Sequence, residues 1–188
     1  MALKNQTKLL FAKKFEEMLQ TTPLDKLRVV DLCKECNTIP QTFYYHFHDK
    51  YELVAWIFIN DFSLTYLKMG SKYSIESIIE NLQQMEEHKL FYQKTYLGNY
   101  QNSINQYIQD FNIKTALAAI KANTPEKEVS TEQVLAIKYH SYGMMGLFKE
   151  WLQDSKQVTI PQLAKFQYSH TPKFLTTAYQ NYDFKCLK

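Results

Sequence analysis

Glycine is scarce in this chain: only four of its 188 residues are glycine, and five are proline. The tight turns of a β-sandwich or barrel, and the phosphate loops of nucleotide-binding enzymes, need more glycines than that. Few helix-breaking residues, together with many Lys, Glu, Gln and Leu residues, favour helices over strands. The sequence therefore predicts an all-α protein of about nine helices.

Long apolar runs are also lacking. None approaches the ~18–20 residues that span a bilayer. The first twenty residues mix charged and apolar side chains and lack the hydrophobic segment of a secretory signal peptide. Three cysteines cannot all pair within one chain, which fits a reducing compartment better than a disulfide scaffold. We therefore expect a cytoplasmic protein with no membrane partner.

An excess of charge of one sign is missing as well. The net charge is only +3, and residues 1–70 hold nine basic and eight acidic residues, which leaves +1. A net positive charge this small permits a nucleic-acid partner but does not indicate one. Any affinity for phosphate groups depends on where individual cations lie.

The motifs of common enzymes are absent. The chain has no G-x-S-x-G, no H-E-x-x-H and no Walker loop, and no acid pair stands out, so we expect neither an enzyme nor a cofactor. Cys33 and Cys36 form a C-x-x-C, which suits a redox pair, half a zinc site or simple packing. Packing is favoured because no second ligand pair stands at zinc spacing. His46 and His48 point apart on a helix, so no metal site is expected.

The first seventy residues contain four predicted helices. The apolar spacing places them over Ala2–Leu19, Arg28–Cys36, Pro40–Phe47 and Lys50–Met69. Pro40 is typical of a first helical position, Asp49 is a good N-cap, and Gly70 with Ser71 ends the last helix. The two short helices are separated only by Asn37-Thr38-Ile39, which predicts a helix-turn-helix whose second helix enters a DNA major groove.

Five further helices are expected beyond Ser71. They cover Ile75–His88, Leu90–Leu97, Ser103–Ala122, Ser130–Gln153 and Pro161–Tyr182. The breaks between them fall at Gly98-Asn99, Asn123-Thr124-Pro125 and Asp154-Ser155. We expect a DNA-binding domain over residues 1–49, a connecting helix over residues 50–70, and a helical effector-binding and dimerisation domain over residues 71–188.

The second short helix has one apolar and one polar face. Phe43 and Phe47 lie four residues apart, so they share a face and should anchor the helix to the core. The polar and amphipathic side chains that remain are Gln41, Thr42, Tyr44, Tyr45 and His46. Gln matches the major-groove edge of adenine, and Thr, Tyr and His donate to phosphate oxygens. Lys50, at the start of the next helix, suits a phosphate.

From Val29 to Leu53 the chain resembles the TetR family of bacterial transcriptional regulators. The resemblance lies in Val29-Val30-Asp31-Leu32, Thr42-Phe43-Tyr44-Tyr45-His46-Phe47, Lys50 and Glu52-Leu53. In that family the third helix reads DNA, and the second and fourth helices begin at the phosphate backbone. The resemblance implies DNA contacts from Arg28, Thr38, Pro40, Gln41, Thr42, Tyr44, Tyr45, His46 and Lys50.

Three residues depart from the family pattern. Arg28 stands where a small hydroxyl residue is usual, and it offers an ionic contact in place of a hydroxyl one. Asn37 replaces a turn glycine, and asparagine tolerates the left-handed conformation. Ile39 replaces Ser or Thr and cannot cap a helix, so Thr38 is expected to cap instead. Pro40 offers no long side chain to a base, so Gln41 and Tyr44 should carry more of the readout.

The C-terminal half is similar to the TetR subgroup that includes the dihydroxyacetone-kinase operon activator. The matching segments are Tyr142–Leu152, Asn60-Asp61-Phe62 and Phe91–Lys94. In the TetR family the last two helices of each protomer form a dimer interface, a use that fits Gly143, Gly146, Leu147, Phe148 and Trp151. Close packing within the chain is the alternative explanation of the two glycines.

Aromatic residues are abundant in the C-terminal half, and most should be core. A subset should line a ligand cavity between helices, for which the candidates are Tyr96, Tyr107, Tyr139 and Tyr142. The sequence thus predicts a homodimeric regulator that binds a near-palindromic double-stranded DNA operator and responds to a small ligand or protein partner. The alternative is a helical protein-interaction adaptor that has lost DNA binding.

Overall fold

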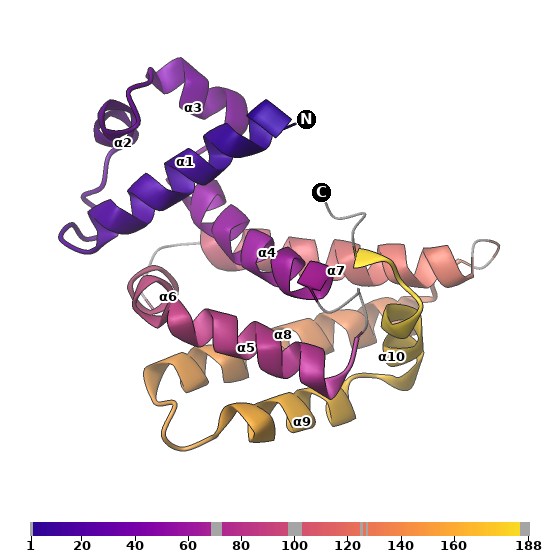
Figure 1. Ribbon diagram of the computed structural model, residues 1–188. Helices are drawn as coiled ribbons and strands as arrows, with labels where there is room; N and C mark the ends of the chain where they lie inside the picture. Colours follow the sequence, from indigo (N-terminus) through magenta and orange to yellow (C-terminus); the bar gives the residue numbers. More distant parts are fainter. Residues whose placement is uncertain (1, 69–72, 98–102, 125, 127, 185–188) are drawn as a thin grey trace. The chain divides into compact units, whose positions relative to one another are not determined.

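The computed structural model describes residues 2–68, 73–97, 103–124, 126 and 128–184 (Figure 1). Within these ranges the chain forms ten α-helices and no strand, which confirms the all-α prediction. The helices are α1 (Ala2–Leu19), α2 (Val29–Glu35), α3 (Pro40–His46), α4 (Lys50–Lys68), α5 (Ile75–Glu87), α6 (Lys89–Tyr96), α7 (Ser103–Asn123), α8 (Thr131–Gln153), α9 (Ile160–His170) and α10 (Lys173–Gln180).

The tenth helix arises because the predicted helix over Pro161–Tyr182 is two helices. Thr171 is extended, with ψ of 128°, because the residue before a proline avoids the helical region. Pro172 then precedes α10 as its N-cap. Several expected boundary residues and one thiol lie outside the described residues, namely Met69, Gly70, Ser71, Gly98, Asn99, Pro125 and Cys186.

Side-chain caps fix the starts of several helices. The Asp49 carboxylate accepts the backbone N–H groups of Tyr51 and Glu52, both at 2.8 Å, which confirms its role as the N-cap of α4. Ser130 and Thr159 open α8 and α9 with reciprocal bonds to a glutamine three residues later. These caps set where each helix begins and therefore which side chains share a face.

The chain folds into two compact units, each built from two stretches of sequence. The N-terminal unit comprises Met1–Phe58 and Leu90–Tyr107, and the C-terminal unit comprises Ile59–Lys89 and Ile108–Lys188. The boundary falls within α4, after the first residue of α6 and again within α7. The functional division of the chain into residues 1–49, 50–70 and 71–188 stays a prediction.

The core of the N-terminal unit is rich in phenylalanine. Phe11 of α1 meets Phe43 of α3 edge to face, with ring centroids 5.3 Å apart. Phe43 and Phe47 are almost fully buried, which confirms that this pair anchors α3. Helix α2 contacts both α1 and α3, so the two short helices are held by packing rather than by their own length.

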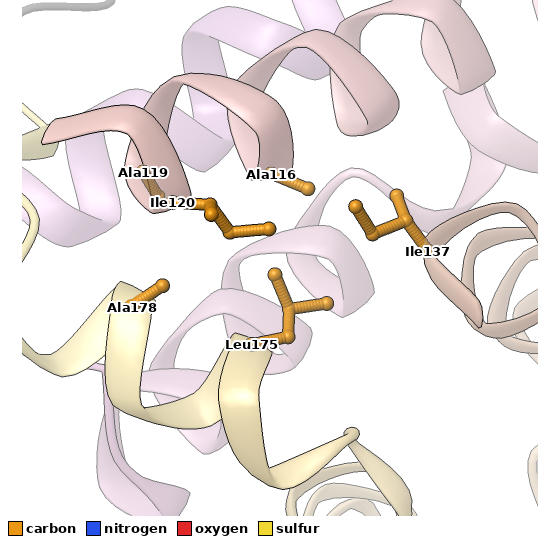
Figure 2. Close-up of a cluster of buried hydrophobic side chains, with 6 residues drawn as sticks. All are labelled: Ala116, Ala119, Ile120, Ile137, Leu175 and Ala178. Atoms are coloured by element: carbon orange, nitrogen blue, oxygen red, sulfur yellow. The ribbon is translucent and has the colours of Figure 1, made fainter. Parts of the chain in front are cut away.

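The C-terminal unit packs α7, α8 and α10 around small side chains (Figure 2). Ala116, Ala119 and Ile120 of α7 face Leu175 and Ala178 of α10, and Ile137 of α8 completes the cluster. Alanines at the contact let the helix axes approach closely. In the same unit α5 packs along α9.

In the part of the chain that the structure describes, every helix is too short or too polar to cross a bilayer.

Candidate nucleic-acid interface

The turn between α2 and α3 is closed by backbone hydrogen bonds. The Thr38 N–H donates to the Cys33 carbonyl at 2.9 Å, and the Asn37 N–H donates to the Lys34 carbonyl at 3.0 Å. This is the Schellman arrangement, which needs a left-handed residue just after the helix. Asn37 supplies it with φ of 51°, which confirms that asparagine takes the place of a turn glycine.

Helix α3 begins without a side-chain cap. Its N-cap is Ile39, and Pro40 occupies the first helical position as expected. The prediction that Thr38 caps this helix was wrong, because the Thr38 hydroxyl instead donates to the Ile39 carbonyl at 3.2 Å. The Ile39 side chain makes no cap bond, and at this end the Thr42 N–H donates to the Ile39 carbonyl at 2.9 Å.

The outward face of α3 presents two tyrosines and a glutamine. Tyr44 is 58% exposed and Tyr45 is 71% exposed, and Gln41 is exposed one turn earlier. The Tyr44 ring stands edge-on against the buried Phe43, with centroids 5.6 Å apart. The Tyr44 ring is therefore supported on one side by the core, while the greater part of both tyrosines remains in solvent.

The remaining predicted α3 contacts are half-buried. The His46 ring lies 5.1 Å from the Tyr45 ring and 6.4 Å from both Phe11 and Phe47. Thr38, Pro40 and Thr42 are also half-buried. These side chains line the edge of the exposed face, and only part of each reaches solvent.

Lys50 points into the unit. Its ammonium group donates to the carbonyls of Leu24, Asp25 and Leu27, at 2.7, 3.1 and 2.9 Å. Three bonds use all the donors that a lysine has. Burial lowers the Lys50 pKa, although nearby Asp25 and Asp49 act against that shift. Sequence reasoning missed this arrangement, because nothing in the motif tells whether an ammonium faces solvent or backbone.

Arg28 forms a two-pronged ion pair with Asp31. Its Nε and Nη2 atoms donate to the two carboxylate oxygens at 2.7 and 3.0 Å. The guanidinium holds the Asp31 pKa below its usual range, and Lys34 contributes from 3.8 Å. The Arg28 side chain is 74% exposed, so water screens the pair, and three guanidinium N–H groups are left for other acceptors.

Two exposed aliphatic side chains on this segment were not predicted as contacts. Val30 is 49% exposed and Ile39 is 60% exposed. An aliphatic group on a DNA-facing surface suits the methyl group of thymine. The sequence flagged Ile39 only as a departure from the family pattern, and its exposure depends on the turn geometry.

The C-terminal unit contains a cavity of about 90 Å³. None of the four predicted ligand tyrosines lines it: Tyr96 and Tyr107 belong to the N-terminal unit, and Tyr139 and Tyr142 are 83% and 50% exposed. Ligand binding by these four tyrosines stays a prediction, and helical spacing does not tell which face of a helix meets the cavity. The residues that line it are Phe62, Tyr66, Tyr73, Phe111, Asn112, Thr115, Ile137, His140, Ser141, Met144, Gln167, Leu175, Tyr179 and Phe184.

The two glycines of α8 lie on an open surface. A Cβ atom added at Gly143 or Gly146 would meet no described atom within 4 Å. Close packing within the chain therefore does not explain them. Phe148 and Trp151, predicted with them as interface residues, are instead buried in the C-terminal unit, with ring centroids 6.0 Å apart, and Leu147 is half-buried.

The two cysteines of the C-x-x-C are packing residues. Cys33 and Cys36 are both buried free thiols, and burial raises the Cys36 pKa to about 11. A protonated thiol is a poor nucleophile and a poor zinc ligand. Among the described residues, no three His, Cys, Asp or Glu side chains gather as metal ligands would.

Comparison with known proteins agrees with this picture. Residues 72–169 match a TetR-type family model described as transcriptional regulator C-terminal region. The chain is 29% identical over 92 residues to the HTH-type dhaKLM operon transcriptional activator DhaS of Lactococcus lactis subsp. lactis (strain IL1403). That match covers 48% of this chain and about half, 49%, of the relative.

A solved structure is similar over nearly the whole chain. It is titled dihydroxyacetone kinase operon activator DhaS, and the match covers 92% of this chain and 96% of that one. The TM-score is 0.50 at 20% sequence identity, so this similarity supports the fold and carries no information about function.

Proposed function

Since the chain belongs to the TetR family of transcriptional regulators, we propose that it binds operator DNA through the α2–turn–α3 segment. In this proposal the segment is a helix-turn-helix and α3 lies in the major groove. Gln41, Tyr44 and Tyr45 contact base edges and sugars, and Ile39 contacts a thymine methyl group. Arg28, Thr38, Thr42 and His46 contact phosphates, Pro40 lies beside them, and Lys50 positions the segment.

One observation carries this proposal: the two sides of α3 differ sharply in burial. Phe43 is fully buried while its neighbours Tyr44 and Tyr45 are more than half exposed. The solvent-exposed parts of these two tyrosines add nothing to the stability of a free monomer, since exposed aromatic surface costs free energy in water. A rigid helix with an aromatic and amide surface suits contacts with base edges.

We further propose that the protein is a homodimer that pairs through α8. Its exposed residues Leu135, Tyr139, Tyr142, Gly143 and Gly146 recur at spacings of three and four, so they form one stripe, which we call the α8 stripe. Helix α9 adds Phe166, which is 45% exposed. Glycines without neighbours allow the backbone of a second copy to approach closely, and two-fold symmetry suits a near-palindromic operator.

The C-terminal unit is the proposed place of regulation in the bacterial cytoplasm. A small ligand or a protein partner that binds one arrangement of the dimer more tightly than another would change the affinity of the dimer for its operator. The names of the relatives describe activators of one operon, and by analogy we propose that this chain controls an operon of metabolic genes.

The direct test is retention on the DNA upstream of its own gene, in a titration at fixed salt. Replacing Tyr44 or Gln41 with alanine should weaken binding by about tenfold or more, since one good base contact contributes about 1–3 kcal/mol. Lys156→Ala, in an exposed loop of the other unit, is the matched control. Unchanged binding by both variants would refute α3 as the reading helix, and no retention of the parent chain would favour the adaptor alternative.

A further inference from the structure

Two buried hydroxyl groups in the C-terminal unit have no hydrogen-bond partner among the described residues. They are Thr115 Oγ1 of α7 and Ser141 Oγ of α8. Thr115 is 4% exposed and Ser141 is 6% exposed, and both line the cavity described above. Buried hydroxyls are nearly always bonded, and a helical Ser or Thr has a ready acceptor in the carbonyl four residues back. These two leave that acceptor unused beside the cavity.

The walls of the cavity carry no formal charge. Among the described residues that line it there is no Asp, Glu, Lys or Arg. Much of the lining is aromatic, and Ile137 and Leu175, both labelled in Figure 2, join it to the core. An ion placed here would lose its hydration without gaining a counter-ion, so the lining selects uncharged molecules.

The hydrogen-bond pattern beside the cavity also fixes the state of His140. The Thr171 hydroxyl donates to the Gln167 carbonyl at 2.8 Å, so its oxygen accepts from Tyr73 Oη at 2.9 Å and from His140 Nε2 at 3.3 Å. Burial lowers the His140 pKa, which keeps the ring neutral. A neutral ring with its proton on Nε2 leaves Nδ1 as an acceptor.

We propose that this cavity binds a small uncharged molecule with two or more hydroxyl or carbonyl groups, held by Thr115 and Ser141. A single water needs about 10–15 Å³ of space of this kind, so the cavity of about 90 Å³ has room for a molecule of several non-hydrogen atoms. A short polyol or hydroxyketone is of that size. The inference builds on the proposed regulation through the C-terminal unit, whose small-ligand class it names.

The test uses the full chain and glycerol as the probe, with saturation-transfer NMR and a titration for the dissociation constant. Glycerol and hydroxyacetone should bind saturably, and the charged isostere glycerate should not. Thr115→Val and Ser141→Ala each remove one hydroxyl at nearly constant volume and should weaken glycerol binding by about tenfold, the usual effect of one lost hydrogen bond. Thr177→Val, an exposed α10 residue, should leave it unchanged.

Two outcomes would overturn the inference. One is the absence of saturable binding of glycerol and of hydroxyacetone to the folded chain. The other is that the Thr115→Val/Ser141→Ala double variant, with a native near-ultraviolet circular dichroism spectrum, binds glycerol as tightly as the parent chain does. Retention on upstream DNA, measured on the same samples, separates the two proposals. If DNA retention persists without glycerol binding, the cavity inference fails alone.

Discussion

Two lysines of the N-terminal unit and two hydroxyl groups of the C-terminal unit differ in whether they have hydrogen-bond partners in the part of the chain that the structure describes. In the N-terminal unit the ammonium groups of Lys50 and Lys94 bond backbone carbonyls that the local helices leave open. In the C-terminal unit the hydroxyls of Thr115 and Ser141 have no partner among the described residues, and the α8 stripe lies in solvent. These two ammonium groups find their partners within their own unit, whereas the two hydroxyls and the α8 stripe leave places for another molecule.

The largest expected effect tests the open surface of the C-terminal unit. Tyr139 is 83% exposed at the centre of the α8 stripe, so Tyr139→Glu should leave the monomer folded. A buried charge in a two-fold interface meets its own copy, and loss of a central aromatic contact costs about 2 kcal/mol or more. We expect the dimer dissociation constant to rise by about 30-fold or more, measured by sedimentation.

Lys121→Gln, at an exposed site of α7, changes the net charge by the same single unit and should leave the dimer intact. A Tyr139→Glu protein that sediments as the parent does would remove the α8 stripe from the interface. A parent chain that is monomeric at micromolar concentration would refute the dimer itself.

The next effect tests the hydrogen bonds that Lys50 donates to backbone carbonyls within the N-terminal unit. Lys50→Met keeps the aliphatic stem but removes three bonds, and the carbonyls of Leu24, Asp25 and Leu27 lose a charged donor. We expect the free energy of unfolding to fall by about 2 kcal/mol in a urea titration. Lys26→Met, at an exposed site, should change it by less than about 0.5 kcal/mol. Equal curves for the two variants would mean that the three bonds contribute nothing.

The contrast between these sites shows where sequence reasoning succeeds. Phe43, Phe47 and Asn37 were read correctly, because each obeys a local rule: helical spacing for the pair and left-handed backbone for the turn. The break at Thr171-Pro172 was missed although the proline rule was there to be applied. In all three cases the information lies within a few neighbouring residues.

Contacts between distant segments were beyond the sequence. The direction of the Lys50 ammonium depends on carbonyls more than twenty residues away. Likewise Tyr66 lines the cavity while Tyr142 lies in solvent, and both stand in amphipathic helices. Which face of a helix meets which neighbour is a property of the packed unit, so the sequence predicted the helices but not which tyrosines line the cavity.

A smaller effect separates the monomer from the dimer. Gly146→Ala adds a methyl group in open space, so in a monomeric Tyr139→Glu background the free energy of unfolding should rise by about 1 kcal/mol. In the parent background the same methyl group should weaken dimerisation, because the stripe would no longer permit close approach. Circular dichroism during urea titration measures the first effect and sedimentation the second. Stabilisation in both backgrounds without loss of dimer would place Gly146 outside the interface.

The smallest effect concerns His140, which borders the cavity in the C-terminal unit. Burial lowers its pKa in the folded state below the unfolded value of about 6.5. As pH falls through that range the unfolded chain takes up the proton first, so stability that is present above pH 6.5 is lost on acidification. His140→Gln keeps a donor for Thr171 but cannot titrate, and unfolding curves between pH 7.5 and 5.5 should show a shallower loss of stability. His170→Gln, at an exposed site, should keep the parent slope. Parallel slopes for the parent and His140→Gln would mean that His140 takes up its proton over the same pH range in the folded and unfolded chains, so that burial does not hold the folded ring neutral.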